Sequence, residues 1–216
     1  MSPAQQATAE RLYRGCIEFV DAHLRSLLSF VPDDAIVVVV GDHGEEFDHG
    51  AYRHARLYDE CVRVPLFVRN LPEVSSTARV RQLDLAPSVV ARLGLPVPAE
   101  WQGEPCDGTT RDSFMVNHSP HRSESYLGVR TDRYKYIETF AAATGDRSRT
   151  ELYDLATDPG ERQNLAGREG EVELELASKV EWFRDRHDIE AGLSRGTRVA
   201  TGSADPSERL EALGYV

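Results

Sequence analysis

The sequence lacks several features that mark whole classes of protein. No apolar run in its 216 residues approaches the ~20 that a membrane-spanning helix needs, and residues 1–10 are polar, without the apolar core of a signal peptide. Its three cysteines are widely spaced and form no Cys-x-x-Cys pair, so we expect neither a disulfide framework nor a thiolate zinc site. We therefore expect a cytoplasmic protein of one or one and a half domains that enters no membrane.

Lysine is also scarce, because Lys135 and Lys179 are the only two among 25 basic residues. The 36 acidic residues outweigh the basic ones and give a formal net charge of −11 at pH 7. A charge of this sign repels nucleic acid and anionic lipid, so we expect no nucleic-acid partner. With 40% hydrophobic and 28% charged residues, the chain has the composition of a globular protein.

The first half of the chain has the pattern of an α/β layer arrangement. Apolar residues at helical spacing predict a helix with one buried face over residues 7–30. The unbroken β-branched run over residues 35–40 predicts a strand buried on both faces, as in a parallel sheet. A second short strand is predicted over 64–68 and a helix over 83–93, followed by a linker rich in proline and glycine over 94–108.

The second half has the pattern of a small antiparallel unit followed by helices. The predicted elements are strands over 126–130, 134–140 and 151–155, a helix over 169–187 and a last helix over 205–214. Residues 188–204 are expected to be flexible. Arg130 and Lys135 fall in the predicted hairpin, where we interpret them as surface residues or members of hairpin salt bridges.

The residue types suited to chemistry are concentrated in residues 41–54. Asp42 and His43 directly follow the strand predicted over 35–40, and ligands of open α/β sheets bind beyond the carboxyl ends of strands. A neighbouring carboxylate and imidazole supply a hard oxygen and a nitrogen, which is half of a divalent-metal site. On spacing alone, Asp-His-Gly is more often a turn at the end of a strand. His49 and His54 are more often loop histidines facing solvent, although both could turn back toward the same pocket.

The chain contains a series of motifs that can be compared with known protein families. They are Asp42-His43-Gly44-Glu45-Glu46-Phe47 with His49-Gly50, the segments 57–66 and 83–88, the segments 129–136 and 151–161, and the closing Leu213-Gly214-Tyr215. In this order they resemble the second half of a sulfatase of the alkaline-phosphatase superfamily. The resemblance implies an α/β fold: the C-terminal part of an alkaline-phosphatase-like sandwich with a parallel sheet, plus a small antiparallel α+β subdomain. We accordingly divide the chain into a catalytic-domain part (1–110), the antiparallel subdomain (111–168) and a helical tail with a flexible linker (169–216).

The resemblance also implies roles for individual residues. Asp42 and His43 match the late pair of metal ligands in the family, where the metal is calcium by resemblance and magnesium or manganese are alternatives. His54 falls where many members carry a lysine that contacts the sulfate, so it is expected to bind substrate and to be catalytic. His49 belongs to the same motif and is a second catalytic candidate. The implied substrate is a sulfate ester of a small molecule or a glycan.

The chain does not contain the motif by which sulfatases first resemble one another. That motif is Cys/Ser-x-Pro-x-Arg, whose first side chain is oxidised to formylglycine, and none of Cys16, Cys61 and Cys106 begins it. We therefore expect a metal-dependent sulfatase represented by its C-terminal half, inactive and poorly soluble alone, with an N-terminal half as a partner. The alternatives are a phosphoester or phosphonate hydrolase of the same superfamily, and a non-catalytic remnant or partner subunit.

Overall fold

The computed structural model describes residues 2–49, 54–77, 79–118, 123–141, 144–187 and 189. Its helices are α1 (Pro3–Leu28), α2 (Asp59–Val62), α3 (Pro72–Ser75), α4 (Gln82–Arg92) and α5 (Gly170–Arg186). Its strands are β1 (Val37–Val40), β2 (Leu66–Arg69), β3 (Ser113–Asn117), β4 (Glu124–Arg130), β5 (Tyr134–Ala141) and β6 (Arg147–Asp154). The predicted last helix over 205–214 and nearly all of 188–204 lie outside the described residues.

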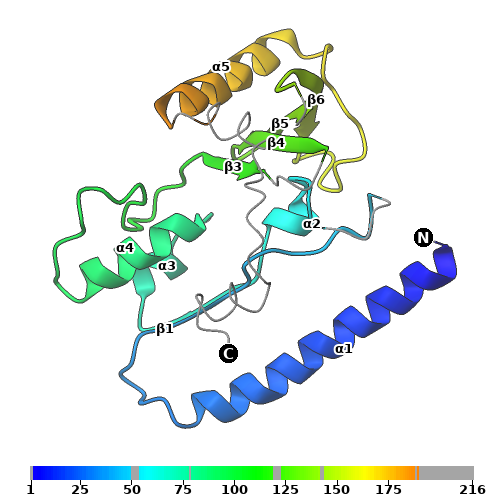
Figure 1. Ribbon diagram of the computed structural model, residues 1–216. Coiled ribbons are helices and arrows are strands. Elements are labelled where there is room, and N and C mark those ends of the chain that lie inside the picture. Colours follow the sequence, from blue (N-terminus) through cyan, green and yellow to red (C-terminus); the bar gives the residue numbers. More distant parts are fainter. Residues whose placement is uncertain are drawn as a thin grey trace, which may run out of the picture.

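The first unit is a two-stranded sheet covered on one side by α3 and α4 (Figure 1). The β-branched run does form β1, but β1 pairs with β2 in antiparallel register, Val37 opposite Arg69 and Val40 opposite Leu66. The predicted burial on both faces is wrong for this chain, because β1 is only partly buried and Val40 is exposed. Both sheets of the described residues are antiparallel throughout. The β1–β2 sheet packs against α3 and α4 through Val38 and Val68, whereas Phe67 is exposed.

The second unit is the antiparallel sheet β3-β4-β5-β6, in which each strand pairs with its neighbour in sequence. Alternate side chains of a strand point to opposite faces, and here both faces are covered. On one face, Tyr136 packs with Leu176 and Val180 of α5. On the other, Ile137 packs with Leu57 of the segment that leads into α2. The predicted hairpin, third strand and following helix are confirmed, and β3 is an additional strand.

Helix α1 begins with a capping box, in which Ser2 accepts from the backbone of Gln5 and the Gln5 side chain accepts from the backbone of Ser2. No residue of the helix is buried, and it stands apart from both sheets (Figure 1). The predicted buried face is therefore not buried within the described chain. Its apolar residues are exposed instead: Leu12, Ile17, Phe19, Val20 and Leu27.

None of the helices in the described residues is both long and apolar enough to span a bilayer.

Candidate functional site

The first two predicted site residues lie at the carboxyl end of β1, in a segment that we call the ligand loop (residues 41–49). Asp42 is exposed over 91% of its side chain, and its Oδ1 accepts from the backbone N–H of His43 at 2.8 Å. That hydrogen bond, followed by the nearby His43 ring, lowers the pKa of Asp42, which is therefore ionised at neutral pH. His43 Nε2 lies 3.8 Å from Asp42 Oδ2, so the two potential ligand atoms face each other.

His54 follows the ligand loop in sequence and lies close to His43 in space. Its ring stacks on that of His43, with centroids 4.4 Å apart and an angle of 23° between the planes. Its Nδ1 lies 3.4 Å from Glu45 Oε2. Asp42, His43 and His54 all line one broad groove of about 1240 Å³, together with Gln82 and residues of β2, β3 and α4. The structure thus brings together three of the four predicted site residues.

Gly44 sets the course of the ligand loop. A Cβ atom at this position would lie 2.0 Å from the backbone oxygen of Glu60, so only glycine fits without movement of the backbone. The Gly44 N–H donates to the Cys61 oxygen at 2.7 Å across the same contact. The glycine therefore serves a close approach between the loop and α2, and this packing holds Asp42 and His43 in place.

His49, the fourth predicted residue, lies away from the groove. Its side chain is 15% exposed, and its ring stacks on Tyr58 with centroids 3.8 Å apart. Its Nδ1 is hydrogen-bonded to the carboxylate of Glu60, and its Nε2 lies 3.1 Å from the backbone oxygen of Glu161. Both ring nitrogens are thus occupied within the protein, in contacts that join the ligand loop to the second sheet unit.

A buried ion cluster lies beneath this contact, and sequence reasoning missed it. Lys135, whose side chain is 0% exposed, pairs with Asp59 and lies 2.7 Å from Glu161 Oε1. Arg130 Nε donates to Asp59 at 3.1 Å. Burial alone would raise the pKa of Asp59, but the two cations outweigh it and hold the pKa below its usual range. Lys135 is therefore a buried member of the core and not a surface residue of the hairpin.

The donor set at Asp42 and His43 fits a divalent cation but does not complete its coordination. His43 Nδ1 lies 2.9 Å from the Gly44 oxygen, and with an N–H at Nδ1 the other nitrogen, Nε2, would be available as a ligand atom beside Asp42. Among the described residues, no group of three or more His, Cys, Asp or Glu side chains could hold a metal. Further ligands would have to come from elsewhere.

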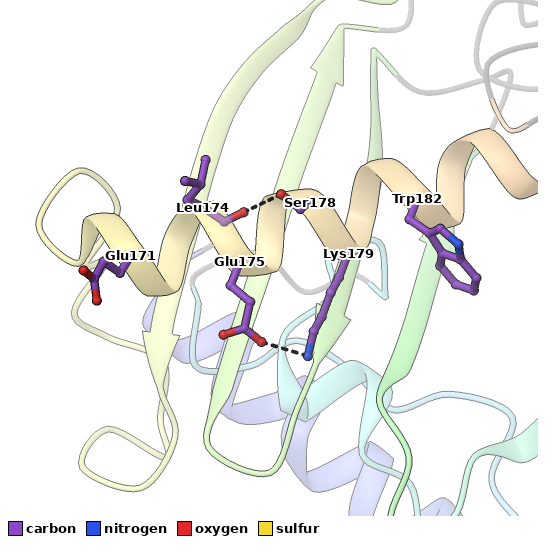
Figure 2. A pocket seen from close by; sticks show the side chains of 6 residues that line it. All are labelled: Glu171, Leu174, Glu175, Ser178, Lys179 and Trp182. Atoms are coloured by element: carbon purple, nitrogen blue, oxygen red, sulfur yellow. Dashed lines mark hydrogen bonds and ion pairs between the residues drawn. The ribbon is translucent and has the colours of Figure 1, made fainter.

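A second hollow lies on the outer face of α5, far along the chain from these residues. Figure 2 shows that all six lining side chains come from this one helix, with Lys179 paired to Glu175 and the Ser178 hydroxyl bonded to the Leu174 oxygen. Leu174 and Trp182 are exposed at its ends. The hollow has no histidine or cysteine, and its one cation, Lys179, is paired with Glu175 and Asp112, so it has none of the chemistry of the groove.

Comparison with known proteins decides the family. The profile of the family described as N-sulphoglucosamine sulphohydrolase, C-terminal, matches residues 47–186. The chain belongs to the sulfatase family. The match contains His49 and His54 and the whole antiparallel sheet, and it begins just after Asp42 and His43.

Individual sulfatases show the same relationship. The chain is 31% identical over 167 residues to a Delta 4,5-hexuronate-2-O-sulfatase of Bacteroides thetaiotaomicron, covering 68% of this chain and 34% of that protein. It is 26% identical over 182 residues to an N-acetylglucosamine-6-O-sulfatase of the same organism, covering 73% and 32%. The solved structure of a 2-O GAG sulfatase aligns with a TM-score of 0.60 and 28% identity, covering 81% of this chain and 40% of that one.

These relationships confirm the sulfatase fold class. The chain spans about a third of the length of the curated sulfatases that it matches.

Proposed function

We propose that this chain is the C-terminal part of a metal-dependent sulfatase that hydrolyses a sulfate monoester to an alcohol and inorganic sulfate. The observation that carries the proposal is the groove at the end of β1, where Asp42, His43 and His54 lie together in a chain of the sulfatase family. Because related sulfatases are described as acting on N-acetylglucosamine and hexuronate sulfates, we infer a sulfated sugar as the substrate class.

In this proposal Asp42 and His43 hold a calcium ion. Asp42 supplies an ionised carboxylate, and His43 supplies Nε2, which is available as a ligand atom with an N–H at Nδ1. The separation of 3.8 Å between Nε2 and Oδ2 is within the range of about 3–4 Å expected for two ligands of one ion. The cation would neutralise charge on the sulfate oxygens.

His54 is proposed to bind the sulfate group. Its ring is half exposed in the groove and is stacked on His43, so a sulfate held by the cation would lie within its reach. A ring N–H of His54 can donate a hydrogen bond to a sulfate oxygen, and its Nδ1 lies 3.4 Å from Glu45 Oε2.

The nucleophile and the remaining metal ligands are proposed to come from an N-terminal sulfatase segment outside this chain. Two observations support this division. The metal donors among the described residues form no cluster of three. Helix α1 and one side of the β1–β2 sheet carry exposed apolar residues where a covering segment would pack, among them Phe19 and Phe67.

The test is an assay of an aryl sulfate and a sulfated disaccharide, using this chain alone and this chain coexpressed with an N-terminal segment that contains Cys-x-Pro-x-Arg. We expect calcium-dependent turnover only from the pair, and its loss when Asp42 is changed to Asn. Asp146→Asn is the matched control, because Asp146 is an exposed aspartate in the turn between β5 and β6. Turnover by the chain alone, or an active Asp42→Asn pair, would contradict the proposal, and hydrolysis of a phosphate ester alone would favour the phosphoesterase alternative.

A further inference from the structure

His49 lies where the ligand loop meets the second sheet unit. The nitrogen Nδ1 faces the Glu60 carboxylate, and Nε2 faces the main-chain oxygen of Glu161 at 3.1 Å. Neither partner is an ordinary donor, because an ionised carboxylate and a peptide carbonyl only accept hydrogen bonds. A neutral imidazole has one N–H, so it would satisfy one partner and turn a lone pair toward the other.

The carboxylate itself is held in its ionised form by other donors. Glu60 Oε2 accepts from the backbone N–H of Phe47 at 3.0 Å and of Asp48 at 2.8 Å. Burial alone would raise the pKa of Glu60, but the hydrogen bonds that its carboxylate accepts, first among them that from the Asp48 N–H, outweigh it and hold the pKa below its usual range. Glu60 therefore does not supply the missing proton, and the imidazole must donate from both nitrogens.

The other groups around the ring are compatible with an imidazolium. Tyr58 stacks on it with an angle of 12° between the planes, and an aromatic face attracts a cation. Arg56 Nη2 donates to the His49 backbone oxygen at 2.7 Å and is itself paired with the buried Glu46. Asp48, next in the chain, faces Arg162 at 3.5 Å. The guanidinium of Arg56, which bonds the His49 backbone, thus has its own anionic partner in Glu46.

We propose that His49 is a positioning residue: as an imidazolium clamped between Glu60 and the Glu161 carbonyl, it fastens the ligand loop to the antiparallel sheet unit. Glu161 suits this role, because its carboxylate also accepts from the backbone of Asp59 at 2.5 Å and pairs with buried Lys135. Loss of one ring proton breaks one of the two bonds and loosens the loop that carries Asp42 and His43. The consequence for cation binding rests on the proposed function, whereas the clamp itself does not.

Glu60→Gln is the decisive variant. A glutamine amide can donate to Nδ1 while its oxygen still accepts from Phe47 and Asp48, so a neutral imidazole with its proton on Nε2 satisfies every partner. The variant therefore keeps the shape of the clamp and removes its need for a second proton. His49→Phe keeps the stacking on Tyr58 and removes both hydrogen bonds, which separates the role of the ring from that of its protons.

The experiment uses the full chain, alone or with its N-terminal segment if the pair is more soluble. Nitrogen-15 NMR of the imidazoles, assigned with His49→Phe, should show protons on both His49 nitrogens at pH 7 and on one in Glu60→Gln. Hydrogen exchange of the ligand loop, corrected for intrinsic rates, should accelerate about ten- to a hundredfold when His49 loses its proton. This factor is the equilibrium constant that corresponds to the free energy of one charge-assisted hydrogen bond. Glu60→Gln should abolish this pH dependence, and His23→Gln, at an exposed histidine of α1, should leave it unchanged.

A singly protonated His49 at pH 7, or a Glu60→Gln variant with the pH profile of the unchanged chain, would overturn the proposal. If His49→Phe does not fold, the pH dependence of hydrogen exchange in Glu60→Gln still decides, because that readout needs no assignment of the imidazole signals. A clamp that behaves as described in a chain that neither binds calcium nor joins an active sulfatase would refute the proposed function and leave this inference intact.

Discussion

The close approach of Gly44 to α2 allows a quantitative prediction about what holds Asp42 and His43 in place. In Gly44→Ala the new Cβ would lie 2.0 Å from the Glu60 oxygen, 3.0 Å from the Glu60 carbonyl carbon and 3.3 Å from Cys61 Cα. All three are backbone atoms, so no side chain can rotate away. The loop must move by more than 1 Å, at a cost of about 1–3 kcal/mol for overpacking. Movement also breaks the hydrogen bond from Gly44 to Cys61, worth about 1 kcal/mol.

We therefore expect Gly44→Ala to lower the free energy of unfolding by about 2–4 kcal/mol. The assay is urea unfolding followed by far-ultraviolet circular dichroism, with hydrogen exchange of residues 44–62 to locate the change. Gly15→Ala is the matched control: nothing lies within 4 Å of its new Cβ in α1, so the same substitution should strengthen that helix by about 0.5–1 kcal/mol. Equal midpoints for Gly44→Ala and the unchanged chain would refute the packing argument.

Three further predictions concern the charged groups. Lys135→Met should lower the free energy of unfolding in urea by about 3–5 kcal/mol, because it leaves Asp59 and Glu161 buried without their cation. Lys179→Met, at a partly exposed ion pair, should lower it by less than about 1 kcal/mol. The lowered pKa of Asp59 stabilises the folded chain above its unfolded pKa of about 3.9, and this contribution is lost as the pH falls below that value. The difference in the free energy of unfolding between the unchanged chain and Asp59→Asn should therefore shrink in acid titrations. A constant difference would exclude this linkage. Chelation of calcium should abolish turnover of the assembled sulfatase and readdition should restore it, with unaltered turnover in chelator counting against a role for Asp42 as a ligand.

The elements that sequence reasoning predicted correctly are those whose partners lie nearby in the chain. The hairpin of β4 and β5 closes within a few residues of Thr131, and its apolar residues recur on both faces, so pattern and turn chemistry agree. The strand β3 was missed because its apolar core, Phe114-Met115-Val116, is too short to show a period. It forms because β4 offers it a complete edge to pair with.

The site residues likewise divide into those whose partners are near in the sequence and those whose partners are distant. Asp42 and His43 are recognisable because both follow one strand, and His54 lies close enough in sequence to return to them. The pairing of Lys135 with Asp59 joins residues 76 positions apart, and no local pattern indicates it. A lysine between two tyrosines, Tyr134 and Tyr136, in a largely buried strand was the available signal, since a charge at an inward position requires a partner. The burial expected for β1 was wrong because, among the described residues, β1 pairs only with β2 and packs against α3 and α4 on one side.

Helix α1 has one more implication, for spectroscopy. A helix of 26 residues without a single buried side chain receives little help from packing beyond the contact of Tyr13 with Phe47, and most helical stability in proteins comes from packing. Its ellipticity should consequently be low and strongly temperature-dependent in the free polypeptide, and should rise when an apolar surface closes over Leu12 and Phe19. If the proposed N-terminal segment packs there, the ellipticity of α1 reports that packing without any label.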